Sequence, residues 1–200
     1  MNMVTKLERK HLEEIVSIHS VSFKDFFLTS LGGHFLHLFY SEFLWHPSAI
    51  AYVFIENNLV KGFIVGSLNT STFYKSILLR HCFYYALLTL PALIKKPKIF
   101  LRLIKALRYP QKYKNEKPSI SVSILSIAVL PEEQGKGIGK KLINTFINAC
   151  RNCNAKEISL STDNKNNQLT KNFYESVGFN LNKTYVTSEK RSMNFYKKDL

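Results

Sequence analysis

Three glycines at alternating positions, Gly135, Gly137 and Gly139, follow a hydrophobic run in this sequence. Glycine carries no side chain, so the backbone N–H groups of such a turn can approach a phosphate closely. Apolar residues at helical spacing over 142–150 predict that a helix follows, and the N-terminus of a helix attracts anions. The segment therefore predicts a site for an anionic ligand, with a diphosphate as the physical expectation. Its spacing fits neither the G-x-G-x-x-G of dinucleotide-binding domains nor the G-x-x-x-x-G-K-[ST] of nucleotide hydrolases, which argues against both classes.

Tyr174 is a second residue with a chemical use. It lies in a predicted helix over residues 167–177, which Gly178 ends. A phenol keeps its proton at neutral pH, so a tyrosine near a leaving group can act as a general acid. The alternative is that Tyr174, beside Phe173, is simply an aromatic residue of the core.

The cysteines and histidines carry weaker signals. Cys150 and Cys153 form a C-x-x-C, but no second ligand pair is nearby, and their helical surroundings favour a packed helix end over zinc or redox chemistry. His34 and His37 are spaced i, i+3 on a predicted helix, yet the sequence offers no third ligand. We therefore expect no metal site.

The elements that must position these residues alternate along the chain. Runs rich in β-branched and aromatic residues predict strands at residues 4–7, 51–56, 59–68, 119–129, 157–162, 179–187 and 190–198. Apolar residues at helical spacing predict helices at 8–19, 33–45, 142–150 and 167–177. Asn57 and Asn58 tolerate the left-handed conformation of a tight hairpin, so they predict a turn between the second and third strands. The order indicates an α/β fold, with a mixed central sheet of about six to seven strands flanked by helices.

The composition fits one globular domain over residues 1–200, because 46% of the residues are hydrophobic and 21% are charged. The chain contains 13% aromatic residues, with eight Gly and six Pro, which excludes a disordered or collagen-like chain. Three cysteines, an odd number, cannot make a disulfide framework, and the charged N-terminus lacks a secretory signal. We therefore expect a cytoplasmic protein.

Basic charge concentrates in residues 71–117. The chain has 28 Lys and Arg against 14 Asp and Glu, a formal charge of +14, and this segment holds eleven of the basic residues against the single acid Glu116. We expect a helical basic insertion between the third and fourth strands, with separate apolar and basic faces at 98–107. Arg80, His81 and Pro91 interrupt the apolar run 77–94, which therefore falls short of a membrane span.

Three interpretations of this insertion stay open. It is a solvated helical hairpin, a surface that rests on the inner face of an anionic membrane, or a contact for a phosphorylated acceptor. Nucleic acid is not expected, because Phe100, Tyr109 and Tyr113 do not form a series that could stack on bases.

Two segments carry a family resemblance. Residues 124–139, I-L-S-I-A-V-L-P-E-E-Q-G-K-G-I-G, resemble motif A of the GCN5-related N-acetyltransferases (GNAT), with Gln134, Gly137 and Gly139 in its Gln-x-x-Gly-x-Gly core. Residues 167–179, N-Q-L-T-K-N-F-Y-E-S-V-G-F, resemble the family's Asn-x-x-Ala-x-x-x-Tyr-x-x-x-Gly-Phe segment, with Thr170 in place of the Ala. The order of elements also resembles the family fold, outside roughly 71–117.

The resemblance implies acetyl-CoA, or a related acyl-CoA, as acyl donor, without a metal. It implies that backbone N–H groups of the glycine turn hold the pyrophosphate, and that a backbone N–H near Val129 or Leu130 faces the thioester carbonyl. It also implies that Asn167 binds the pantetheine arm and that Tyr174 protonates the departing thiolate. The cofactor-binding residues that it implies are Ala128, Val129, Leu130, Gln134, Gly135, Lys136, Gly137, Ile138, Gly139, Lys140 and Asn167.

The general base stays open. Some family members place a Glu where this chain has Ser123, and residues 119–129 contain no carboxylate. Glu42 is the first candidate, as base or acceptor contact; the others are His34, His37, His46 and Glu157.

The function that we expect is direct transfer of an acetyl group to an amine of a small molecule, such as an amino sugar or a membrane-associated glycan precursor. The alternative is a catalytically weak module on the same fold that binds acyl-CoA, nucleic acid or membrane.

Overall fold

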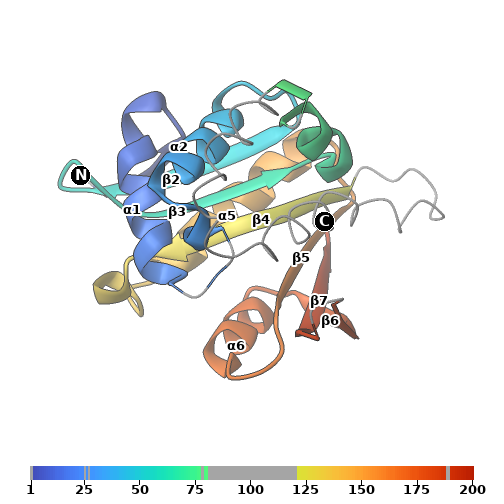
Figure 1. Ribbon diagram of the computed structural model, residues 1–200. Coiled ribbons are helices and arrows are strands. Elements are labelled where there is room, and N and C mark those ends of the chain that lie inside the picture. The colour runs from blue at the N-terminus through green and yellow to red at the C-terminus, as the bar shows by residue number, and fades with distance from the viewer. Residues whose placement is uncertain (1, 25, 27, 78, 81–120, 188–189) are drawn as a thin grey trace.

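A computed structural model describes residues 2–24, 26, 28–77, 79–80, 121–187 and 190–200. Its centre is one sheet with the strand order β1-β2-β3-β4-β5-β7-β6 (Figure 1). The strands are β1 (Met3–Lys6), β2 (Ala49–Glu56), β3 (Leu59–Ser67), β4 (Ser121–Val129), β5 (Glu157–Asp163), β6 (Asn180–Val186) and β7 (Ser192–Asp199). The α-helices with described bounds are α1 (Leu12–Ser22), α2 (Gly33–Ser41), α5 (Ile138–Asn152) and α6 (Gln168–Ser176). Residues 70–77 and 79–80 are helical as well.

The predicted α/β fold with its mixed sheet is confirmed. Asn57 and Asn58, with φ of 51° and 62°, form the left-handed turn between β2 and β3. The predicted helix over 33–45 is shorter than expected, because α2 ends at Ser41 and a 3-10 helix, Glu42–Leu44, replaces its last turn. Most of the basic insertion, residues 81–117, lies outside the described residues, and so does the amphipathic stretch 98–107. In the described part of the chain, no helix is long and apolar enough to cross a membrane.

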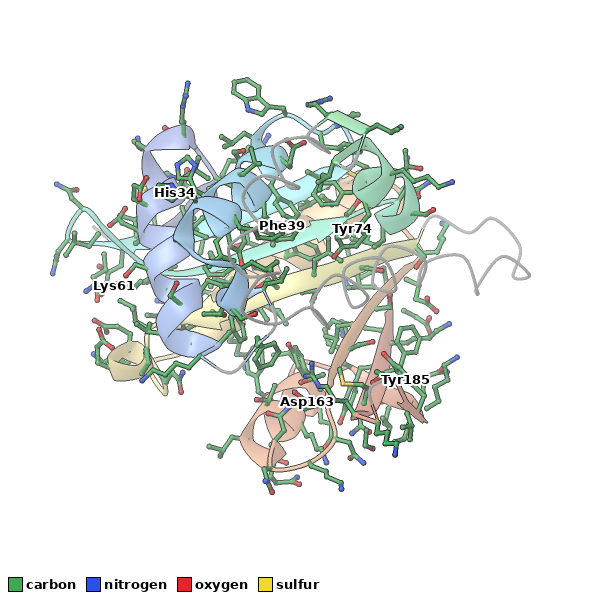
Figure 2. All side chains as sticks on the ribbon, viewed as in Figure 1. His34, Phe39, Lys61, Tyr74, Asp163 and Tyr185 are labelled. Atoms are coloured by element: carbon green, nitrogen blue, oxygen red, sulfur yellow. The ribbon has the colours of Figure 1, made fainter. Side chains whose placement is uncertain are left out.

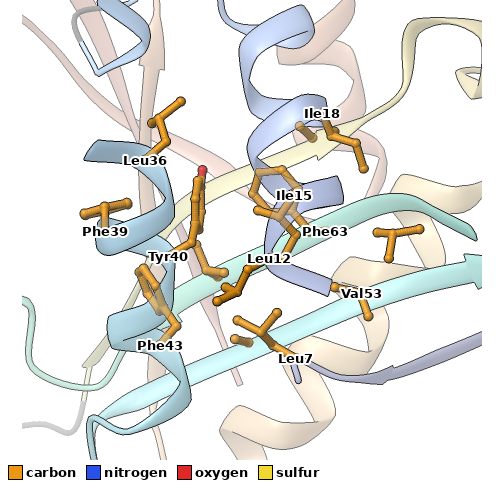
Figure 3. Close-up of a cluster of buried hydrophobic side chains, with 14 of the residues drawn as sticks. Leu7, Leu12, Ile15, Ile18, Leu36, Phe39, Tyr40, Phe43, Val53 and Phe63 are labelled. Atoms are coloured by element: carbon orange, nitrogen blue, oxygen red, sulfur yellow. The ribbon is translucent and has the colours of Figure 1, made fainter. Parts of the chain in front are cut away.

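Two hydrophobic cores cover the two faces of the sheet. On one face, apolar residues of α1 and α2 pack against alternate residues of β2 and β3. Tyr40 belongs to this cluster and brings a polar hydroxyl group into it (Figure 3). On the other face, α5 packs Leu142, Phe146 and Ile147 against β2 to β5. The period-2 alternation of the strands supplies both faces, so residues next to each other in β4 belong to different cores.

The sheet splits between β4 and β5. Ser121–Ser123 of β4 pair in parallel with Glu157–Ser159 of β5. Beyond Ser123, β4 continues to Val129 without a strand partner on that side among the described residues. A register shift, in which Val65 pairs with Ser126 and Gly66 with Ile124, leaves Leu125 as the extra residue of a β-bulge on β4. Figure 1 shows β5, β6, β7 and α6 diverging from the rest of the sheet. The split leaves one edge of β4, residues 124–129, without a strand partner in the described part of the chain, and we call this unpaired edge the gap.

Candidate functional site

The glycine turn at the end of β4 presents free backbone donors. A 3-10 helix, Pro131–Glu133, leads into it, and Gly135 and Gly137 both have φ of 79°, which an L side chain rarely adopts. Gly137 is the N-cap of α5, no side chain caps the helix, and the first helical bond back to it comes from the Lys141 N–H at 3.1 Å. The N–H groups before Lys141 therefore lack helical partners and favour an anion.

Gly139 allows close helix packing, whereas the sequence predicted that it lets a phosphate approach the backbone. It lies inside α5, and a side chain there would meet the ring of Phe173 on α6 at 3.2 Å, whereas nothing stands within 4 Å of such a position at Gly135 or Gly137. The absence of a side chain at Gly139 thus brings α5 and α6 together. Only the first two glycines leave room for a ligand.

An acidic side chain beneath the turn holds two lysines. The Glu133 carboxylate accepts a hydrogen bond from Lys136 at 2.7 Å and forms an ion pair with Lys61 of β3 at 3.2 Å. The hydrogen bond with Lys136 and the contact with Lys61 hold the pKa of Glu133 below its usual value. Figure 2 shows Lys61 at the end of the sheet where the turn lies. Because its ammonium group is engaged with Glu133, Lys136 offers a ligand mainly its backbone N–H.

Asn167 faces the turn from the other side of the split. Its side-chain amide nitrogen donates to Thr162 Oγ1 at 2.7 Å and to the carbonyl of Asp163 at 3.0 Å, which fixes the start of α6 to the end of β5 (Figure 2 labels Asp163). Both amide protons are used, so the oxygen is the group that Asn167 can offer to a ligand N–H. A hollow of about 640 Å³ joins the two sides and is lined by Gln134, Asn164, Asn166, Asn167, Gln168, Leu169, Thr170 and Lys171.

The edge of β4 supplies further donors, but not at Leu130. The family resemblance implied a free N–H near Val129 or Leu130, but the Leu130 N–H already donates to the carbonyl of Lys61 at 2.9 Å. Backbone groups alternate between the two edges of a strand, so Ala128 also faces β3, while Ile127 and Val129 face the gap. Gln134 confirms this geometry, because its amide nitrogen reaches the carbonyl of Val129 at 3.4 Å.

Tyr174 lies two helical turns after Asn167 and is 6% exposed. Its ring packs on Phe179 and Tyr196, with centroid separations of 5.9 and 6.0 Å, in the core on the α5 face. Burial raises the pKa of Tyr174, so its phenol carries a proton at neutral pH. The core position predicted as the alternative is confirmed, and the role of Tyr174 as a general acid stays a prediction.

Four of the five candidate bases have structural partners in the described part of the chain. Glu42 is buried, and the guanidinium of Arg80 lies 3.8 Å from its carboxylate. His46 pairs with the hydroxyl of Ser48 at 2.8 Å. On α2, His34 is exposed and is labelled in Figure 2, while the imidazole of His37 lies 3.4 Å from Glu13; Glu157 pairs with Lys197 at 2.9 Å. Glu42 as a base stays a prediction.

A buried polar group that the sequence reasoning missed connects three elements. His19 Nδ1 of α1 and the Tyr40 hydroxyl of α2 are 2.6 Å apart, and the Tyr40 hydroxyl donates to Ser126 Oγ of β4 at 3.3 Å. Burial lowers the pKa of His19 to about 4. The available signal was a histidine within the apolar stripe of the first predicted helix.

The C-x-x-C pair is a helix end, as the sequence predicted. Cys150 is fully buried on α5 and burial raises the pKa of its thiol to about 12, while Cys153 is exposed and no disulfide joins them. Among the described residues, no group of three His, Cys, Asp or Glu could hold a metal ion.

Comparisons with known proteins agree with this geometry. Residues 104–179 match the model of the acetyltransferase (GNAT) family. The chain superposes over its full length on 98% of an N-acetyltransferase from Staphylococcus aureus Mu50, with a TM-score of 0.65 and 15% identity. A second match is an aminoglycoside 6'-N-acetyltransferase complexed with coenzyme A. The match covers 98% of this chain and 96% of that protein, with a TM-score of 0.62 and 11% identity. A third match is a putative acetyltransferase from Salmonella typhimurium, solved with its cofactor acetyl-CoA. The match covers 100% of this chain and 94% of that protein, with a TM-score of 0.60 and 15% identity. None of the curated proteins matches the chain.

Proposed function

Because residues 104–179 match the acetyltransferase (GNAT) family, we propose that the chain transfers an acetyl group from acetyl-CoA directly to an amine. The observation that carries the proposal is the split between β4 and β5, which opens beside the uncapped N-terminus of α5. A pyrophosphate at that helix end and an extended arm in the gap would satisfy backbone groups that the described part of the chain leaves without a strand or helix partner. Two of the structural relatives hold coenzyme A or acetyl-CoA, which supports the assignment.

Each part of the donor has a complementary group. Backbone N–H groups from Gly135 to Lys140 bind the pyrophosphate, with the left-handed glycines leaving them accessible. The oxygen of Asn167 accepts from an amide of the pantetheine arm. Along the arm, the N–H groups of Ile127 and Val129 line the gap, since Leu130 is engaged with β3.

The transfer itself needs an acid more than a strong base. A neutral amine attacks the thioester carbonyl, the C–S bond breaks, and the thiolate takes the proton of Tyr174. The positively charged nitrogen formed by the attack loses a proton to solvent, and solvent returns a proton to the phenolate. An amine acceptor needs only modest assistance to lose its proton, which fits a strand β4 without a carboxylate.

We propose a small-molecule amine, such as an amino sugar, as acceptor. A structural relative that acts on aminoglycosides supports this class. Release of thiol from acetyl-CoA with a panel of amino sugars tests the activity. Tight acetyl-CoA binding without thiol release from any amine would instead favour the acyl-CoA-binding module.

The anion site has a matched pair of variants. Gly137→Leu places a side chain at the turn, and Gly32→Leu places one at another glycine with positive φ (93°) and no atom within 4 Å, outside the turn. Both variants strain the backbone, so a loss that comes only from lower stability affects both. We expect Gly137→Leu to weaken acetyl-CoA binding by more than about tenfold in calorimetry, and Gly32→Leu to leave it within about twofold. Equal affinities would refute the turn as the pyrophosphate site.

The basic insertion can be tested separately. We propose that it contacts an anionic membrane surface or a phosphorylated acceptor. Co-sedimentation with anionic vesicles, compared between the whole chain and a chain without residues 71–117, distinguishes these. Equal binding by both chains would refute the membrane contact.

A further inference from the structure

Three polar side chains from α1, α2 and β4 form a directed chain of hydrogen bonds. Tyr40 is fully buried and has one hydroxyl proton, which it donates to Ser126 Oγ at 3.3 Å. The short contact of 2.6 Å between Tyr40 and His19 must then use a proton on His19 Nδ1. The direction runs from His19 to Tyr40 to Ser126.

The other ring nitrogen of His19 agrees with this direction. Nε2 is buried, and no described residue hydrogen-bonds to it. With the ring proton on Nδ1, Nε2 is left with a lone pair and no unsatisfied N–H in the apolar core. His19 is 3% exposed and stays neutral at neutral pH, so the hydrogen-bonded series of His19, Tyr40 and Ser126 carries no net charge.

Ser126 is the last residue in this series of hydrogen bonds. A serine hydroxyl has one proton and two lone pairs, and accepting from Tyr40 uses one lone pair, so the proton is left for another acceptor. Donors in series polarise one another, which strengthens the last donor. The contact from Tyr40 is long for an O–H···O bond, as bonds in unliganded sites often are before substrate tightens them.

Ser126 lies where β4 opens toward the gap. Leu125, Ser126 and Ile127 are all partly exposed, although β4 is a central strand with neighbours on both sides at its start. The Ser126 side chain points to the α1–α2 face, toward Tyr40, and the N–H of the next residue, Ile127, points along the sheet into the gap. A hydroxyl and the following backbone N–H can reach one oxygen atom together.

The length of the donor arm brings its end to this level. From phosphorus to sulfur the arm has about 13 bonds, which span about 16 Å when extended. From Leu130 back to Ser126 the strand covers four residues, about 13 Å. An arm whose phosphorus lies level with Leu130 therefore carries its sulfur past Val129 toward Ile127 and Ser126.

We propose that the Ser126 hydroxyl and the Ile127 N–H together bind the thioester carbonyl oxygen, with Tyr40 and His19 as positioning residues. This rests on the proposed function. When the amine attacks, the carbonyl π electrons move onto that oxygen, and both donors stabilise the resulting charge. The carbonyl re-forms as the C–S bond breaks, so neither donor loses its proton.

The test uses acetyl-CoA labelled with ¹³C at the carbonyl and needs no known acceptor. Isotope-edited infrared spectroscopy reads the stretching frequency of the bound thioester carbonyl, which hydrogen bonds lower. We expect the frequency to rise in Ser126→Ala and to stay low in Ser126→Thr, which keeps a hydroxyl group. Tyr40→Phe should raise it partly, and should add nothing in the Ser126→Ala background. A merely structural role of Tyr40 would not produce that dependence.

Binding and turnover separate the two proposals. Ser126→Ala should keep the acetyl-CoA dissociation constant within about twofold while thiol release falls about a hundredfold, as for loss of one oxyanion donor. If acetyl-CoA binds and the carbonyl band is the same in wild type and Ser126→Ala, the role of Ser126 is refuted and the proposed function stands. If the wild-type protein does not bind acetyl-CoA, the proposed function itself fails.

Discussion

Removing His19 should change how the stability of the protein depends on pH. The side chain is 3% exposed, and burial lowers its pKa from the ordinary 6.5 to about 4. Between these two values the unfolded chain binds a proton at His19 and the folded protein does not. The free energy of unfolding therefore falls as the pH drops from 6.5 toward 4, and this contribution is fully present above 6.5.

The two pKa values set the size of the effect. One pKa unit corresponds to about 1.4 kcal/mol, so His19 removes about 3 kcal/mol in total once the pH is below 4. Between pH 7 and pH 5 the loss is about 2 kcal/mol. Burial also lowers the pKa of His11 and His46, so the whole protein loses more than this over the same range.

Urea unfolding of wild type and His19→Gln at several pH values isolates the His19 part. The difference in unfolding free energy between the two proteins should shift by about 2 kcal/mol in favour of the variant as the pH falls from 7 to 5. Ser20→Ala, on the same helix and without a titrating group, should run parallel to wild type. Parallel curves for His19→Gln as well would show that His19 is not buried in its neutral form.

Three further outcomes follow from the site. Tyr174→Phe should lower turnover about a hundredfold or more and leave acetyl-CoA affinity within about twofold, measured by thiol release and calorimetry; unchanged turnover would exclude the acid role. Lys136→Met should change that affinity by less than about threefold, because Glu133 already holds the ammonium group, and a larger loss would make the lysine a phosphate ligand. Gly139→Ala should cost about 1–2 kcal/mol in urea unfolding through its contact with Phe173, and Phe173→Leu should restore part of it; additive losses would contradict that contact.

Local chemistry explains what the sequence could predict. Asn57 and Asn58 form a turn because of their own backbone preferences. Gly135 and Gly137 likewise predict a left-handed turn from their residue type alone. Strand and helix periods likewise depend on neighbours in sequence. The strands and α6 lie within one or two residues of their predicted bounds, whereas α1, α2 and α5 each have at least one end that differs by three or four residues.

Contacts between distant residues explain what the sequence could not predict. The fit of Gly139 against Phe173 requires two helices to be placed first, and the contact between Tyr40 and Ser126 joins residues 86 positions apart. The occupied N–H of Leu130 depends on the register between β3 and β4, because a shift of one residue would turn it to the other edge.

The split between β4 and β5 has a consequence for the shape of what can enter it. Unpaired strand edges usually lie at the outside of a sheet, where a whole strand of another chain can add to them. Among the residues that the structure describes, the unpaired edge of β4 lies inside the sheet, because β5 is still joined to β4 at Ser121–Ser123. Such an opening excludes a bulky polypeptide but admits a slender, unbranched chain whose amide groups match the spacing of a strand. The peptide-like arm of the proposed donor, coenzyme A, has that form, so under the proposed function the split selects the donor by thickness as well as by charge.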